Sequence, residues 1–155
     1  MPLCSLHALS RCAQDGPFLA MDWGKKRIGF AISDGKRRVA MPLHSMDALS
    51  WKKIFFFLST VRAERNVQGF LIGWPFLQAY EEEARPEEKK LRNFIEACVA
   101  YDAWSVALWN ERYTTREVQY WCPETVKHVD AHAAALFLQG ALDYLRIHGS
   151  EGGIT

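Results

Sequence analysis

Three acidic residues, Asp22, Glu111 and Asp130, occupy positions where carboxylates can do chemistry. Asp22 ends a short apolar run, Glu111 lies just beyond a second one, and Asp130 opens a stripe of apolar residues at helical spacing. In mixed α/β sheets, functional sites form at the carboxyl ends of strands. Carboxylates gathered there repel one another unless a cation neutralises them, and hard oxygen ligands suit Mg²⁺ or Mn²⁺. Two such ions can activate a water and stabilise the leaving oxygen of a phosphodiester displacement.

Each of these acids also has a purely structural interpretation. A carboxylate in the first turn of a helix is commonly a cap and a partner of the helix dipole, which fits Asp130. Spacing alone leaves both interpretations open.

Hydrophobic periodicity predicts the elements that position the three acids. Strands are expected at 18–21, 27–33, 37–43, 67–72 and 105–109, and helices at 54–61, 91–99, from Thr114 onward, and at 131–145. Asp34-Gly35 is a tight-turn signal between the second and third strands. The order predicts an α/β fold with a mixed five-stranded sheet, in which three antiparallel strands are followed by parallel strands, flanked by helices.

The length of 155 residues fits one domain. Residues 1–17 lack a sustained period and are predicted to be a flexible N-terminal tail, residues 18–148 the single domain, and residues 149–155 a short tail. No apolar run reaches the length needed to span a bilayer, so we expect no membrane partner. The formal net charge is +1, so any binding of nucleic acid has to come from local basic patches.

The four cysteines contain no CxxC pair, which favours neither a zinc site nor a disulfide framework. A reducing cytoplasm is the simpler interpretation. Cys98 shares an apolar helical stripe with Leu91 and Phe94, and is predicted to be a buried small hydrophobe.

Four sequence blocks resemble the YqgF/RuvX family of the ribonuclease H-like superfamily, and they run in family order from about Phe18 to Leu145. The first block, "DWGKKRIGFAISD", resembles the opening motif D-x-G-x-K-R-I-G-x-A-x-S-D. The others are "IGWPF" from Ile72, "NERYTT" from Asn110 and "VDAHAAALFLQGALD" from Val129. They are similar to the family's G-L-P-L, D-E-R-x-[ST]-T and V-D-x-x-A-A-x-x-x-L-Q-x-x-L-D blocks.

The resemblance implies a metal-dependent nuclease with a ribonuclease H-like fold. Asp22, Glu111 and Asp130 match the family's three acids, and would be both the catalytic residues and the ligands of Mg²⁺ or Mn²⁺. In such a fold the strand carrying Gly73 would lie between the strand of Asp22 and that of the NER segment. A glycine there would leave an open floor for metal and phosphate.

The resemblance also implies three alternative functions. The first is a hydrolase that processes the 5′ end of precursor 16S rRNA in ribosome biogenesis. The second is a Holliday junction resolvase, which calls for a symmetric dimer, so the oligomer is expected to be a monomer or a homodimer. The third is a non-catalytic nucleic-acid-binding module.

Basic residues are expected to supply the contacts to nucleic acid. Two sets lie in the predicted hairpin turns and are predicted to form one basic rim beside the site: Lys25, Lys26 and Arg27 in the first turn, and Lys36, Arg37 and Arg38 in the second. Arg112, next to Glu111, is a further candidate for a phosphate contact. The structural alternatives are solvated surface charges and, for Arg112, a salt bridge.

Two tryptophans, Trp23 and Trp74, end predicted strands, where they would either stack on bases or, as is more common, pack in the core.

Three departures from the family pattern affect the expected activity. Asn110 replaces the acid that precedes the family's glutamate, and the loop after Pro75 carries the acidic run 81–83 in place of a glycine-rich segment. Glu111 and Asp130 are only 19 positions apart, and the connection has few positive charges. The short connection weakens the case for tight junction binding more than the case for catalysis, because all three acids are present.

Overall fold

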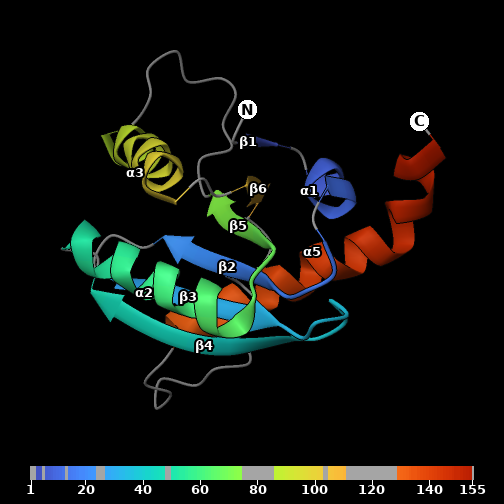
Figure 1. Ribbon diagram of the computed structural model, residues 1–155, viewed down its shortest axis with the longest axis horizontal. Helices are drawn as coiled ribbons and strands as arrows, with labels where there is room; N and C mark the ends of the chain where they lie inside the picture. The colour runs from blue at the N-terminus through green and yellow to red at the C-terminus, as the bar shows by residue number, and fades with distance from the viewer. Residues whose placement is uncertain are drawn as a thin grey trace.

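The structure is a computed structural model that describes residues 3–4, 6–12, 14–23, 27–47, 50–74, 86–102, 105–110 and 129–154 (Figure 1). The strands are β1 (Leu3–Cys4), β2 (Phe18–Trp23), β3 (Arg27–Ser33), β4 (Ala40–Asp47), β5 (Gly69–Trp74) and β6 (Val106–Asn110). The helices are α1 (Leu6–Cys12), α2 (Trp51–Arg65), α3 (Pro86–Asp102) and α5 (Val129–Ile154). The helix predicted from Thr114 onward falls outside the described residues.

All described strands form one mixed sheet in the order β1-β6-β5-β2-β3-β4. Strands β2, β3 and β4 are an antiparallel meander, and β2, β5, β6 and β1 pair in parallel. The predicted arrangement of three antiparallel strands followed by parallel ones is therefore confirmed. The short β1 is an addition that the sequence did not predict.

Side chains of β2 alternate between two hydrophobic clusters, as the period of a strand requires. Leu19 and Met21 join a cluster with α2 and α3, in which Cys98 is buried as predicted. Phe18 and Ala20 join a second cluster with α1 and α5. Helices α2 and α5 thus lie on opposite sides of the sheet (Figure 1). No helix in the described part of the chain is long and apolar enough to cross a membrane.

The N-terminal segment differs from the predicted tail. Leu6 and Leu9 on α1 are only 6% and 1% exposed, and both belong to the cluster beneath α5. The strand β1 pairs with β6 and extends the edge of the sheet. A helix of seven residues is too short to show a sustained period, so its buried positions give no signal in the sequence.

The C-terminal helix also differs from the prediction, because α5 continues to Ile154 instead of ending before Gly149. A glycine inside a helix costs only about 1 kcal/mol relative to alanine, so it does not have to end one. In Figure 1 the C-terminal part of α5 extends beyond the sheet.

The loop between β3 and β4 is longer than predicted, so β4 starts at Ala40 and not near Arg37. One carboxylate oxygen of Asp34 accepts hydrogen bonds from the backbone N–H groups of Arg38 (2.7 Å) and Val39 (2.9 Å). The bond from Val39 is the main cause of a lowered pKa of Asp34; burial opposes it, and the bond from Arg38 adds to the lowering. Arg37 adopts a left-handed conformation with φ of 57°. These local bonds compete with strand pairing and keep residues 34–39 in a loop.

The first long helix, α2, begins shortly after the end of β4, which includes Ser45 and Asp47. Ser50 is the cap, and its hydroxyl accepts a hydrogen bond from the backbone N–H of Lys53 (3.4 Å). Because β3 is antiparallel to both β2 and β4, the connection from β4 to α2 lies at the edge of the sheet where β2 also ends.

Candidate active site

Asp22 lies at the carboxyl end of β2, in the middle of the sheet. It pairs in register with Gly73 of β5, which in turn pairs with Trp109 of β6. Neighbouring strands are about 4.8 Å apart, so the ends of β2 and β6 are separated by about 10 Å with only the buried Gly73 between them. This confirms the predicted strand order at the site.

Glu111 directly follows Asn110, the last residue of β6, and itself lies outside the described residues. Because β2, β5 and β6 are parallel, their carboxyl ends meet at one edge of the sheet. The chain therefore leaves β6 toward Glu111 at the same edge where Asp22 is placed.

Strand alternation puts Asp22 on the face covered by α5. Ala20, two residues earlier, belongs to the hydrophobic cluster that contains Ala134 and Leu138 of α5. The Asp22 side chain is partly buried. Trp23 faces the other way, is 8% exposed, and has its ring 4.9 Å from that of Phe94. Trp23 is thus a core residue and not a platform for bases; the Trp74 side chain lies outside the described part.

Asp130 is the second residue of α5, one helical turn before Ala134, which packs against the sheet together with Leu138. Gln139 fixes the position of this helix along the strands. Its side-chain oxygen accepts from the backbone N–H of Ala40 (2.9 Å), and its amide donates to the backbone carbonyl of Arg38 (2.9 Å).

These two bonds allow the positions of Asp130 and Asp22 to be compared along the direction of the strands. Ala40 pairs with Ser33, whose hydroxyl accepts from the backbone N–H of Phe18, so Gln139 sits near the start of β2. From Gln139 back to Asp130 the helix rises about 13.5 Å. From Phe18 to Asp22 the strand rises about 13 Å. The helix thus starts at about the level where β2 ends.

The fold therefore carries Asp22, the start of α5 and the exit of β6 to one edge of the sheet. Among the described residues no three His, Cys, Asp or Glu side chains form a metal-binding group. Glu111 and the Asp130 side chain are outside that part of the structure.

The predicted basic rim is wrong as a continuous surface. Arg27 is at the Asp22 end of the sheet, since Asp22 pairs with Gly29, and its guanidinium is 3.3 Å from the Ser45 hydroxyl. The second set, 36–38, follows the other end of β3. Consecutive turns of a meander lie at opposite ends of their shared strand, here about 20 Å apart. Lys25, Lys26 and Arg112 fall outside the described residues.

Two polar residues of the last sequence block have roles that the sequence did not reveal. Gln139 holds the start of β4 as described, and it also donates to a carboxylate oxygen of Asp143 (3.1 Å). Arg146 donates to the same oxygen (3.0 Å). This sequence block thus contributes Gln139, which ties α5 to the loop before β4, in addition to a candidate catalytic acid. The helical period places Gln139 and Asp143 on a polar face, and it could not distinguish a hydrogen-bonding role from exposure to solvent.

Comparison with known proteins gives the family of the chain. A family model described as "RuvX: Holliday junction resolvase" matches residues 16–144. The chain belongs to the RuvX family. A RuvX-family relative from Bradyrhizobium sp. is 31% identical over 147 residues, covers 90% of each chain and carries the name "Putative pre-16S rRNA nuclease". A relative of the same name from Cereibacter sphaeroides is 30% identical and covers 94% of each chain.

Solved structures place this RuvX-family chain among ribonuclease H-like folds. Thermus thermophilus RuvC in complex with a Holliday junction substrate superposes with a TM-score of 0.54 at 12% identity, covering 85% of this chain and 96% of that one. A second structure of Thermus thermophilus RuvC gives the same TM-score at 15% identity. At these identities the likeness concerns the fold alone. The family match and the names of the relatives support a nuclease of the hydrolase class.

Proposed function

We propose that this protein is a metal-dependent nuclease that hydrolyses phosphodiester bonds at the edge formed by β2, β5 and β6. The observation that carries the proposal is the placement of Asp22. It sits at the carboxyl end of a central strand, on the α5 face, level with the start of α5, and one strand (β5) separates it from the exit of β6.

In this proposal Asp22, Glu111 and Asp130 hold Mg²⁺ or Mn²⁺, which when bound supplies an activated water and stabilises the leaving oxygen. Asp22 is positioned by the hydrogen-bonded pairing of β2 with both β3 and β5, so its backbone is fixed on two sides. Gly73 contributes no side chain to the floor between the strands, so a phosphate group can approach the sheet closely. Arg27 lies at the same end and is a candidate contact to the nucleic-acid backbone, together with Lys25, Lys26 and Arg112.

The favoured substrate is precursor 16S rRNA, cut toward its 5′ end during ribosome biogenesis. This rests on the names of the relatives that match nearly the whole chain. The cysteines, which contain no CxxC pair, fit a protein that works in the reducing cytoplasm.

A second candidate function is the resolution of four-way DNA junctions, which the description of the family and the fold of the RuvC structures favour. Cutting two strands symmetrically calls for a homodimer, whereas trimming one RNA strand is possible for a monomer. The oligomeric state in solution therefore bears on the choice between the two.

The test is a cleavage assay of the wild-type protein with Mg²⁺, with Mn²⁺ and with excess chelator. The substrates are single-stranded RNA, fragments of precursor 16S rRNA that span the mature 5′ end, and synthetic four-way DNA junctions. We expect metal-dependent cutting with precursor rRNA as the best substrate. Preferred cutting of the junction would select the second function, and binding of all substrates without cutting would contradict the nuclease.

A further inference from the structure

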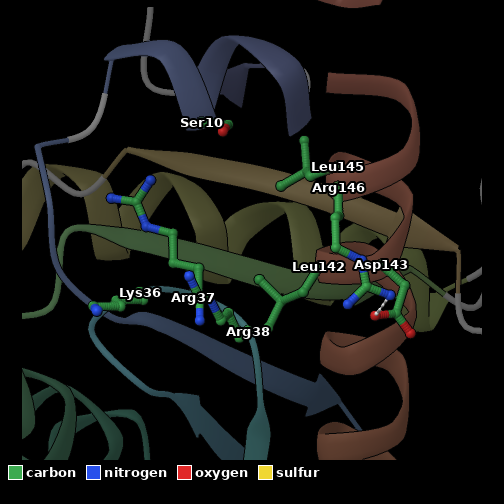
Figure 2. A pocket seen from close by; sticks show the side chains of 8 residues that line it. All are labelled: Ser10, Lys36, Arg37, Arg38, Leu142, Asp143, Leu145 and Arg146. Carbon is green, nitrogen blue, oxygen red and sulfur yellow. Dashed lines mark hydrogen bonds and ion pairs between the residues drawn. The ribbon is translucent and has the colours of Figure 1, made fainter. Parts of the chain in front are cut away.

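A second polar site lies at the end of the sheet opposite Asp22. A cavity of about 460 Å³ opens between α1, the loop that joins β3 to β4, and the C-terminal half of α5 (Figure 2). Its lining residues are Ser10, Lys36, Arg37, Arg38, Leu142, Asp143, Leu145 and Arg146. Four of the eight are cationic and one is anionic. The volume is within the range of clefts that hold small ligands.

The walls of this basic pocket are held in place by their own hydrogen bonds. Asp34 closes the loop through the backbone N–H groups of Arg38 and Val39. Gln139 ties the same loop to α5 through Ala40 and Arg38. A ligand that enters the pocket therefore meets a backbone that is already ordered, which lowers the entropic cost of binding.

Two of the four cations, Arg37 and Arg146, are bound to other groups of the protein, and the other two, Lys36 and Arg38, are available to a ligand. The Arg37 guanidinium donates to the backbone carbonyls of Gly16 and Gln14 and lies 4.1 Å above the centre of the Phe18 ring. Burial lowers the pKa of Arg37, and the nearby Asp15 opposes that shift. Arg146 is paired with Asp143. Among the described residues, the side chains of Lys36 and Arg38 have no hydrogen bond or ion pair.

The acidic groups around the pocket offset only part of this charge. Asp143 is paired with Arg146, and Asp15 lies near Arg37. Asp34 is a third carboxylate; it accepts from two backbone N–H groups of the loop and keeps its negative charge. Four cations against three carboxylates leave a net positive charge, and Lys36 and Arg38 line the pocket together with the fixed Arg37 and the hydroxyl-bearing Ser10. Such a group of donors is suited to a phosphate oxyanion.

We propose that the basic pocket binds a backbone phosphate of the nucleic acid whose cleavage is proposed at the Asp22 edge. The identity of the ligand rests on that proposed function. The pocket is about 20 Å from the Asp22 edge, as the helix rise from Asp130 to Asp143 indicates. At 3.4 Å per base step this distance spans about six steps of a duplex strand. The pocket is therefore a second anchor that only longer substrates can reach.

The test compares four proteins: the wild type, Arg38→Ala, the double variant Lys36→Ala/Arg38→Ala, and the control Arg65→Ala. Arg65 is the control because it is also an exposed arginine, lies at the end of α2 on the other face of the sheet, and does not line the pocket. Binding of 20-nucleotide and 4-nucleotide RNA is measured between 50 and 200 mM salt in chelator, where no cutting occurs. The slope of log affinity against log salt falls by about 0.7 for each lost contact to a single strand.

We expect Arg38→Ala to lower the slope for the long RNA by about 0.7 and the double variant by about 1.4, with unchanged values for the short RNA. Arg65→Ala should match the wild type. Equal slopes for all four proteins on the long RNA would overturn the proposal. So would a loss that is the same for both RNA lengths, since it would place the contact beside the cutting site.

Titration with inorganic phosphate separates the nucleic-acid backbone from a free anion as the source of the phosphate. Tight binding of inorganic phosphate that the double variant abolishes, with no change in the RNA slopes, would make the pocket a small-anion site and overturn the proposal. The readout does not depend on cleavage. A wild-type protein that cuts nothing but shows the slope effect would contradict the proposed nuclease and leave the second anchor supported.

Discussion

Asp22→Asn is expected to lower the cleavage rate at saturating substrate by at least about 1,000-fold, which corresponds to roughly 4 kcal/mol of lost transition-state stabilisation. The substitution keeps the size and the strand pairing of the residue but removes the negative charge that the proposed metal site requires. Substrate affinity should change little, because the contacts to the backbone come from basic residues. Single-turnover kinetics and binding measured on the same RNA separate the two quantities.

The matched control for this prediction is Asp47→Asn. Asp47 also lies at the carboxyl end of a strand, at the same edge of the sheet, but on the outermost strand β4, where it pairs with Arg27 in register. We expect its rate to stay within about threefold of the wild type, as for a surface substitution away from a site. Equal rates for Asp22→Asn and the wild type would contradict a catalytic role for Asp22.

Leu9→Ala is expected to lower the free energy of unfolding by about 2–5 kcal/mol, the usual range for a leucine deleted from a packed core. Leu9 is 1% exposed and packs in the cluster that joins α1 to α5 and to Phe18. Removing its side chain leaves a cavity under α1, which the surrounding sheet cannot close. The measurement is urea unfolding followed by circular dichroism.

The control for the unfolding experiment is Phe56→Ala. Phe56 is a larger apolar residue but is 72% exposed on α2. Its loss should change the free energy of unfolding by no more than about 0.5 kcal/mol. A Leu9→Ala protein as stable as the Phe56→Ala protein would show that α1 does not pack on the domain in solution. That result would agree with the sequence prediction of a flexible tail.

The central strands could be predicted because their burial leaves a direct trace in the sequence. Strand β2 reads as an apolar run up to Asp22, and β5 as an apolar run up to Gly73, since both are buried on two faces. The start of β4 could not be predicted. The side chain of Asp34 accepts hydrogen bonds from the backbone of Arg38 and Val39. These local bonds outweigh the weak strand preference of residues 37–39.

The candidate site could be predicted in part. The order of β2, β5 and β6 follows from the resemblance to the family, and the structure has Gly73 between the other two strands as expected. The basic rim could not be predicted correctly, because basic residues close in the sequence need not be close in space. Arg27 and Arg37 are ten positions apart, yet the extended β3 carries them to opposite ends of the sheet.

The role of Gln139 could not be predicted either. Its partners Arg38 and Ala40 are about 100 positions away, and no local pattern indicates which loop a polar helical residue will contact. The same contact places α5 along the strands and thereby brings Asp130 to the level of Asp22. Gln139 and the buried face of α5 together set the level of the start of this helix relative to the end of β2.

The proposed site is tested most directly by the binding of Mn²⁺, followed by electron paramagnetic resonance, to the wild type and to Asp22→Asn, Glu111→Gln and Asp130→Asn. These three carboxylates are proposed to form one metal site at the edge of β2, β5 and β6. We expect each substitution to weaken Mn²⁺ binding by at least about tenfold and to lower Mn²⁺-dependent cleavage in parallel. Wild-type affinity for Mn²⁺ in any one of the three variants would contradict a shared site.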